Sequence, residues 1–188
     1  LLGGHIWDWK DQGLARYDEY GVKSWGYGGD YERDTDPNSG NFCCNGIVSP
    51  DGTPKPAMWT CKYVYQPVEF TMLDKEELRL SLKNRNFHRS TEGYAYSWEI
   101  KDEDGLIQNG DLDVPVMAPG ESVEVSVPAK KMSFKPGAVY MLNLYSKESA
   151  ALPYAASGHC HSSEQFVLNE RVQPEVPSAK GWEGYGGR

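Results

Sequence analysis

Two tryptophans near the start of the chain are the first candidates for chemistry, because a flat indole face suits the C–H face of a sugar. They are Trp7 and Trp9, which flank the carboxylate of Asp8 within the stretch Gly3–Gly13. In an extended strand the two indoles point to one side and Asp8 to the other. The apolar run ends in polar residues, which is typical of a buried strand that emerges at a functional rim. The alternative is that both tryptophans lie in a core, since large aromatic side chains are mostly buried.

Carboxylates are the second candidates, because a pair of them can supply a general acid and a nucleophile. Asp8, Asp11 and Asp30 lie in the polar part of this region. Their spacing does not favour catalysis over the roles of solvated loop acids or of charges near a helix N-terminus. We therefore assign no catalytic residue to them.

Cysteine and histidine spacing does not indicate a metal centre. No Cys-x-x-Cys or Cys/His pattern typical of zinc is present, and His159-Cys160-His161 has no partner cluster elsewhere in the sequence. Free, partly buried thiols are expected, and the redox compartment stays open. The four cysteines concerned are Cys43, Cys44, Cys61 and Cys160.

Composition indicates an ordinary globular chain of 188 residues, with 39 % hydrophobic and 24 % charged residues. The formal net charge of −8 argues against nucleic acid or an anionic membrane as a partner. No apolar run approaches the length that spans a bilayer. The start, Leu1-Leu2-Gly3-Gly4, lacks an initiator methionine and a basic segment, so we expect it to lie within something larger.

Residues 1–66 are rich in aromatic side chains and poor in regular periodicity. After the opening strand, Asp11–Tyr20 predicts a short helix. A long polar loop follows over Trp25–Gly40, and loops of this length are usually functional or mobile. A second helix is predicted from Pro54 to about Gln66, with Thr53 as its capping residue and a proline at its first position.

From Val68 onward, apolar and polar residues alternate in short runs, which predicts antiparallel strands with one buried face. About seven strands in roughly a hundred residues, with Trp98 in the third, predict a mainly β fold: an immunoglobulin-like antiparallel β-sandwich. Residues 171–188 are rich in proline and glycine and predict a linker or tail. The turn dipeptides between the runs are Asp104-Gly105, Asn109-Gly110, Pro119-Gly120 and Pro136-Gly137.

Four motifs, in order and at similar spacing, resemble the β-galactosidases of glycoside hydrolase family 2. They are Gly3–Leu14, Tyr27–Asp30, Asn41–Val48 and Thr53–Ala57. The likeness continues more weakly through the sandwich, in Gly158-His159 and Glu164-Gln165-Phe166. The resemblance implies that residues 1–66 are the last strand, loop and helix of a TIM barrel, the (β/α)8 catalytic barrel. It also implies that residues 67–170 form the immunoglobulin-like domain that follows it.

The resemblance also implies roles for three residues. Trp7 matches the tryptophan on which galactose lies, and Asn45 matches a residue at the substrate. The backbone carbonyl of Phe42 and the side chain of Asn45 match ligands of a sodium ion, and oxygen ligands suit a hard cation. Without the motif, Phe42 would be interpreted as a core aromatic and Asn45-Gly46 as an ordinary turn. Mg²⁺ is expected in the full-length parent, held by residues outside this sequence.

The two catalytic glutamates of the family lie on earlier barrel strands and match no acid of this chain. The expected function is therefore that of part of a retaining β-galactosidase for terminal β-galactosides, inactive alone and with no catalytic residue of its own. The implied partners are the substrate, the remaining barrel, neighbouring domains and further copies in a homo-oligomer. The alternative is a non-catalytic β-sandwich module for carbohydrate binding or domain scaffolding. Cys44, where the family usually has an apolar residue, and the unusual length of residues 31–40 leave substrate detail open.

Overall fold

The computed structural model describes residues 3–31, 35–38, 42 and 44–170. The chain divides into two compact units, Leu1–Tyr65 and Gln66–Arg188. The predicted linker at 171–188 and the motif positions Asn41 and Cys43 lie outside the described residues. Within the described ranges, no helix is long and apolar enough to cross a membrane.

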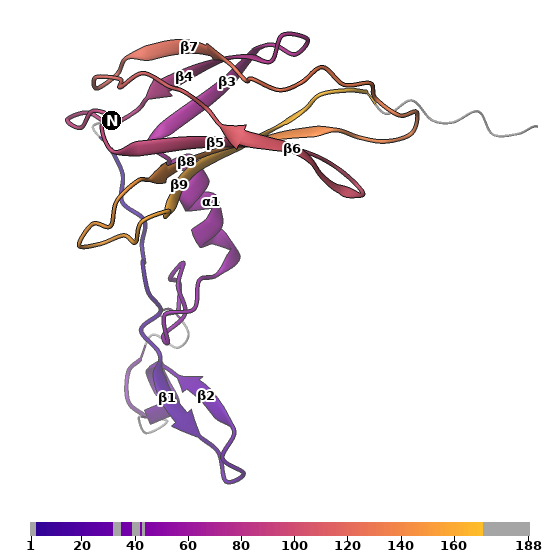
Figure 1. Cartoon of the computed structure of the whole chain (residues 1–188). Coiled ribbons are helices and arrows are strands. Elements are labelled where there is room, and N and C mark those ends of the chain that lie inside the picture. Colours follow the sequence, from indigo (N-terminus) through magenta and orange to yellow (C-terminus); the bar gives the residue numbers. More distant parts are fainter. Residues whose placement is uncertain (1–2, 32–34, 39–41, 43, 171–188) are drawn as a thin grey trace, which may run out of the picture. The chain divides into compact units, whose positions relative to one another are not determined.

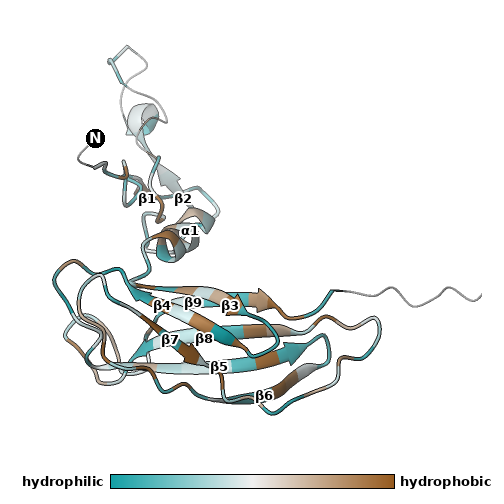
Figure 2. Ribbon diagram, turned by 90° about the horizontal axis from the view of Figure 1, so that it is seen from above, coloured by the Kyte–Doolittle hydropathy of each residue, from teal (hydrophilic) through white to brown (hydrophobic). Residues whose placement is uncertain are grey.

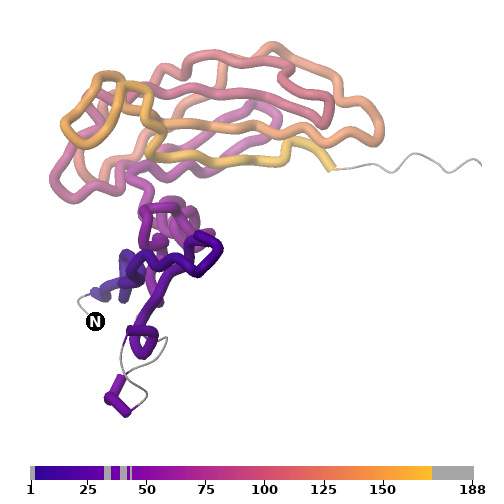
Figure 3. Tube along the Cα trace, turned by 90° about the horizontal axis from the view of Figure 1, so that it is seen from below, coloured from indigo at the N-terminus to yellow at the C-terminus, as the bar shows by residue number. Residues whose placement is uncertain are grey.

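The described part of the second unit is built from seven antiparallel strands in two sheets (Figure 1). One sheet has the order β3-β4-β7 and the other the order β6-β5-β8-β9. The last strand, β9, lies beside β8, and the described part of the chain ends shortly after it (Figure 3). The strands are β3 (Val68–Asp74), β4 (Arg79–Asn84), β5 (Tyr94–Asp102), β6 (Gly105–Asp111), β7 (Ser122–Ser126), β8 (Met141–Glu148) and β9 (Cys160–Val167).

Both sheets contribute their apolar faces to one core. The predicted alternation is confirmed, because every second residue of β4 and β5 is buried while its neighbours are partly or fully exposed, as the banded colouring of the ribbon reflects (Figure 2). Among the aromatic side chains of the sandwich, Tyr96, Trp98 and Tyr140 are buried, and Phe166 is partly buried against this core. The sequence pattern therefore identified both the strands and their inward faces.

Three of the four predicted turn dipeptides are confirmed, and Asn109-Gly110 is wrong. These two residues lie inside β6, where Gly110 pairs with Trp98 of β5. A Cβ on Gly110 would lie 3.2 Å from Nε1 of Trp98, so glycine leaves room for the indole to lie across the neighbouring strand. Glycine in a strand interior often marks such a close approach.

Asn84 is a fully buried polar residue at the end of β4. Its Nδ2 donates to the backbone oxygens of Arg89 (2.9 Å), Ala118 (3.1 Å) and Met117 (3.2 Å). Its Oδ1 accepts hydrogen bonds from the backbone N–H and the side-chain amide of Asn86. One side chain thereby joins the two loops that follow β4 and β6.

The first and last strands of the sandwich also meet. The backbone N–H of Val68 in β3 donates to Oγ of Ser162 in β9 at 3.0 Å, across 94 positions of sequence. The backbone N–H of Ser163 donates to Oε1 of Gln66 at 3.1 Å. These contacts join the two sheets along one edge.

The first unit contains a β-hairpin where a helix was predicted, so the helix over Asp11–Tyr20 is wrong. Strand β1 (Leu14–Tyr17) pairs with β2 (Lys23–Gly26). Asp18 causes the reversal, because its Oδ1 accepts the backbone N–H of Tyr20 (2.9 Å) and of Val22 (2.8 Å). Such local side-chain bonds compete with helix formation.

The other elements of the first unit are a 3₁₀ turn, η1 (Gly28–Tyr31), and the helix α1 (Pro56–Val64). Helix α1 confirms the second predicted helix, but it begins two residues later than expected. Lys55 occupies the capping position without a side-chain cap, and proline is again the first helical residue. The backbone N–H of Thr53, the predicted cap, instead bonds Oδ1 of Asp51 at 2.9 Å.

Residues 66–170 should fold without residues 1–65, because both faces of the core come from strands within this range. We expect this shorter polypeptide to unfold in a single cooperative transition by heat or urea, measured by circular dichroism and tryptophan fluorescence together. Transitions that do not coincide between the two probes would contradict an independently folding sandwich.

Candidate functional site

The two stretches that carry the predicted site residues run side by side in the first unit (Figure 1). Lys10 and Val48 form a parallel bridge between them. Four backbone hydrogen bonds join the stretches: Asp8 N–H to Asn45 O (3.3 Å), Ile47 N–H to Asp8 O (3.1 Å), Val48 N–H to Trp9 O (3.0 Å) and Asp11 N–H to Val48 O (2.9 Å). Motifs 35 or more residues apart in sequence are thus held together by their own backbone.

Trp7 and Trp9 are exposed in this unit, with 78 % and 56 % of their surfaces accessible. Neither is a core residue of the described structure, so the flat face of each indole is open. Trp7 immediately precedes Asp8, whose backbone N–H bonds the carbonyl of Asn45. The peptide bond between Trp7 and Asp8 is cis. The backbone thus brings the position of the Trp7 indole next to the loop that carries Asn45.

Asn45 and Phe42 are in direct contact. Nδ2 of Asn45 lies 3.3 Å from the backbone oxygen of Phe42. Phe42 is 77 % exposed, which excludes the core-aromatic interpretation for the described structure. Turning the Asn45 amide by half a rotation exchanges its nitrogen and oxygen, which places two oxygens side by side.

The residues present fit a hard cation. At ligand distances of about 2.3–2.6 Å, neighbouring ligands of a six-coordinate ion lie roughly 3.3–3.7 Å apart. The 3.3 Å from Nδ2 of Asn45 to the Phe42 oxygen is at the short end of that range, and Oδ1 takes the place of Nδ2 once the amide is turned. Both groups are neutral oxygen donors, which suits a monovalent ion better than a softer metal.

Asp11 is not the solvated loop acid that the sequence suggested. Its side chain is 9 % exposed, and Nζ of Lys55 lies 2.6 Å from its Oδ2 and 2.8 Å from its Oδ1. Oδ1 also accepts the backbone N–H of Gly46 at 2.8 Å. Sequence reasoning missed this pair. The only available signal was that an acid of the first motif and a lysine of the fourth have opposite charge.

Asp8 and Asp30 are engaged in local contacts that are typical of loop acids. Asp8 accepts the backbone N–H of Trp9 at 2.6 Å and the side-chain amide of Gln12 at 2.9 Å. Asp30 accepts the backbone N–H of Tyr27 at 2.9 Å and lies 3.3 Å from Arg16. These contacts account for both carboxylates without a catalytic role.

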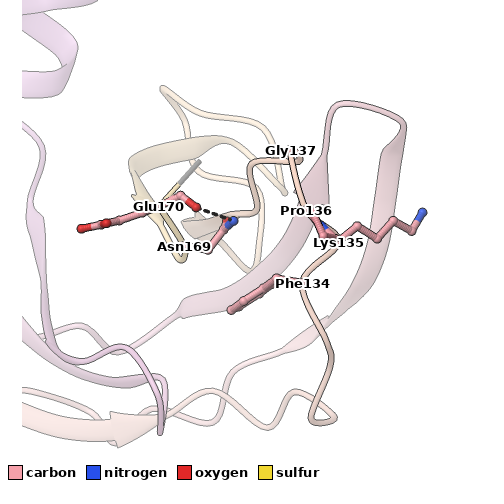
Figure 4. Close-up of a pocket in the computed structure, with 6 residues that line it drawn as sticks. All are labelled: Phe134, Lys135, Pro136, Gly137, Asn169 and Glu170. Atoms are coloured by element: carbon pink, nitrogen blue, oxygen red, sulfur yellow. Dashed lines mark hydrogen bonds between the residues drawn. The ribbon is translucent and has the colours of Figure 1, made fainter. Parts of the chain in front are cut away.

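A hollow of about 260 Å³ on the second unit lies between the ends of two loops (Figure 4). Asn169, the uncharged polar side chain of its lining, is already used: Oδ1 accepts the backbone N–H of Tyr140 and Nδ2 donates to the oxygens of Ala138 and Glu170. The Phe134 ring lines the hollow and packs against Tyr140 in a tilted arrangement, with ring centres 4.9 Å apart. These contacts give the hollow a packing role.

A partly buried ion pair at another end of the sandwich is also structural, with the side chain of Glu148 7 % exposed and that of Arg89 40 % exposed. Arg89 donates from NH1 and NH2 to the two oxygens of Glu148, each at 3.2 Å, and its guanidinium lies over the ring of Tyr94. The hydrogen bond to Glu148 raises the pKa of Arg89 above its usual value. Of the described cysteines, Cys61 and Cys160 are free, partly buried thiols, which confirms the prediction for these two.

Comparison with protein families matches both units. Residues 1–70 match the family described as "Glycosyl hydrolases family 2, TIM barrel domain", and residues 80–169 match "Beta-galactosidase, domain 4". Residues 71–79, which include the end of β3 and the turn before β4, lie between the two matches.

Curated relatives named beta-galactosidase cover most of the chain. The proteins of Aeromonas hydrophila and Alteromonas mediterranea are 34 % and 36 % identical over 89 % of the chain. The protein of Photobacterium profundum is 35 % identical over 94 % of the chain. The chain spans only 16–17 % of the length of these relatives.

Proposed function

This chain belongs to glycoside hydrolase family 2, and we propose that it forms part of a retaining β-galactosidase that hydrolyses terminal β-galactosides. The names of its relatives support the activity, which belongs to a protein about six times as long as this chain. The observation that carries the proposal is the pairing of the Trp7 stretch with the Asn45 loop. It brings a sugar-sized aromatic surface and a pair of oxygen donors onto neighbouring backbone.

We assign Trp7 the role of a platform for the galactose ring. An exposed indole offers an apolar face to the C–H groups of a pyranose, and water is released from both surfaces on contact. Asn45 and the carbonyl of Phe42 would hold a sodium ion beside the sugar. The ion supplies a fixed positive charge for a sugar hydroxyl oxygen, while Asn45 orients its amide toward the same place. The catalytic carboxylates are assigned to other segments of the parent enzyme.

We further propose that the second unit is an immunoglobulin-like domain and that the parent is a homo-oligomer. The strand orders β3-β4-β7 and β6-β5-β8-β9, with Trp98 buried in the third strand, support that topology. The remaining barrel segments are the nearest partners of the first unit, whose helix α1 has no buried residue of its own. The alternative of a carbohydrate-binding sandwich is less favoured, because Tyr96, Trp98 and Tyr140 are buried.

In the full-length enzyme, Asn45→Ala should weaken sodium activation. Loss of one oxygen ligand should raise the sodium concentration that gives half-maximal activity roughly 10–100-fold, a range typical of damage to a metal site. High sodium should restore part of the lost turnover by mass action. The measurement is the rate of chromogenic galactoside hydrolysis during a sodium titration at constant ionic strength.

Trp7→Ala provides the contrast. Removal of the platform weakens ground-state and transition-state binding alike, so KM should rise about tenfold, or roughly 1.4 kcal/mol, with a smaller change in kcat. Its sodium midpoint should stay near that of the wild type. An Asn45→Ala enzyme with low activity at every sodium concentration and an unchanged midpoint would show that Asn45 has no cation role.

A further inference from the structure

The loop that carries Asn45 is fixed by contacts beneath it. Asn45 itself is exposed, and its side-chain amide bonds only the nearby Phe42 carbonyl at 3.3 Å among the contacts recorded for it. The next residue, Gly46, is buried and donates its N–H to Oδ1 of Asp11. The position of the Asn45 side chain therefore depends on the backbone bond from Asp8 to the Asn45 carbonyl and on how Gly46 is held.

Gly46 approaches the backbone of the opposite stretch too closely for any side chain. An added Cβ would overlap the backbone nitrogen of Asp11 and the backbone carbon of Lys10. These are main-chain atoms that cannot rotate away. The loop can reach this depth only with glycine at this position, next to the Asp11 carboxylate.

Lys55 also supports the contact between Gly46 and Asp11. Its backbone N–H donates to the oxygen of Ile47 at 3.0 Å, and its Nζ reaches both oxygens of Asp11. It also occupies the capping position of α1. One residue therefore joins the start of the helix, the Asn45 loop and the Trp7 stretch.

Because this ion pair is largely shielded from water, its loss should cost more free energy than the loss of a surface ion pair. The side chain of Asp11 is 9 % exposed and that of Lys55 is 32 % exposed. Removal of the lysine leaves a carboxylate that is shielded from water and has lost its counter-charge, a situation far more costly than the loss of an exposed pair. Asp11 would then move toward water and pull the Gly46 N–H with it.

We propose that Asp11 and Lys55, together with Gly46, form a loop anchor that positions Asn45 and the Phe42 carbonyl for cation binding beside Trp7. Both charged residues are positioning residues, because they act through Asn45. This inference rests on the cation role proposed for Asn45. It gives a function to the Asp11–Lys55 ion pair, which has no part in the roles proposed for Trp7, Asn45 and the Phe42 carbonyl.

The test is Lys55→Met in the full-length enzyme, with Arg16→Met as the matched control. Arg16 lies in the same unit and pairs with Asp30 at 3.3 Å, but both side chains are exposed and neither bonds the Asn45 loop in the contacts recorded for them. Lys55→Met should raise the sodium midpoint of activity about tenfold, as for the loss of an outer contact to a metal ligand. Arg16→Met should leave the midpoint unchanged.

A second measurement does not depend on turnover. Amide hydrogen exchange of residues 44–48, followed without substrate, should slow as sodium is added to the wild type. In Lys55→Met the same protection should require about tenfold more sodium. Lys55→Arg keeps the charge and should recover most of the protection, whereas a merely structural role would lower the melting temperature without moving this midpoint.

The outcomes separate the anchor from the site it serves. If Asn45→Ala shifts the sodium midpoint and Lys55→Met does not, the anchor is wrong and the cation role stands. If neither variant shifts it, the cation role fails and the anchor fails with it. Should Lys55→Met not fold, Asp11→Ala decides, because it removes both the partner of Lys55 and the acceptor of the Gly46 N–H. A sodium midpoint unchanged in Asp11→Ala would overturn the proposal.

Discussion

Trp98→Ala should lower the free energy of unfolding of the sandwich by about 3–5 kcal/mol, among the largest effects of any single substitution. The indole is 3 % exposed and lies between the two sheets, with Gly110 beneath it. Its removal loses the transfer free energy of a large aromatic and leaves a cavity that rigid β-strands cannot close. Urea unfolding of residues 66–170, followed by circular dichroism, gives the measurement.

Phe87→Ala is the matched control, because it also removes an aromatic side chain from the same unit. Phe87 is 88 % exposed, so its loss should change the stability by less than about 0.5 kcal/mol. A loss below about 1 kcal/mol for Trp98→Ala would mean that the indole is not a core residue in solution.

Asn84→Ala should destabilise the sandwich by about 3–5 kcal/mol, although it removes no apolar surface. The backbone oxygen of Arg89 loses its recorded donor, and the backbone N–H of Asn86 loses its recorded acceptor, at a site with no exposed surface on Asn84. The oxygens of Met117 and Ala118 lose one of two donors each. Each buried group left without a partner costs about 1–3 kcal/mol, and partial relaxation of the two loops keeps the sum below the simple total.

Asn109→Ala supplies the comparison for that substitution. Asn109 lies in β6 of the same unit and is exposed, so its truncation should change stability by less than about 0.5 kcal/mol. Equal effects of the two alanine variants in urea unfolding would show that the contacts of Asn84 are replaced by water at little cost.

Alternation with a period of two was sufficient to predict the sandwich, because residues on one side of a strand share one environment. Leu80, Leu82 and Trp98 follow it and are buried. Asn84 continues the same inward series, and nothing in its sequence neighbourhood shows that three loop carbonyls converge on it. Which loops come together depends on the tertiary structure. The sequence could therefore show that a polar residue occupies an inward position, but not which groups it would bond.

The wrong predictions have a common physical origin, which is that a local signal was outweighed by its surroundings. Asn109-Gly110 has the composition of a turn, yet it lies inside β6. There the missing side chain of Gly110 leaves room for the Trp98 indole of the neighbouring strand. The stretch Asp11–Tyr20 was expected to be a helix that ends at Gly21, yet the carboxylate of Asp18 organises a reversal. In both cases one side chain changes the path of the backbone.

The candidate site was predictable only through the resemblance of its motifs. Composition alone would have left Trp7 as a core residue and Asn45 in an ordinary turn. The Asp11–Lys55 pair was not predictable, because its partners are 44 positions apart in sequence and each is an ordinary charged residue by itself. The order of the motifs indicated which segments matter, and the structure shows which side chains join them.

The contact between the first and last strands of the sandwich has a consequence for how the protein is made. A ribosome adds roughly 5–20 residues per second, so about 5–20 s separate the synthesis of Val68 from that of Ser162, its partner 94 positions later. Collapse of a chain of this size takes at most about 100 μs. During that interval β3 and β4 have no β9 to close against, and their apolar faces stay open to chaperones and to neighbouring nascent chains. The rate of translation, rather than the rate of folding, thus sets how long the partly synthesised domain is at risk of aggregation.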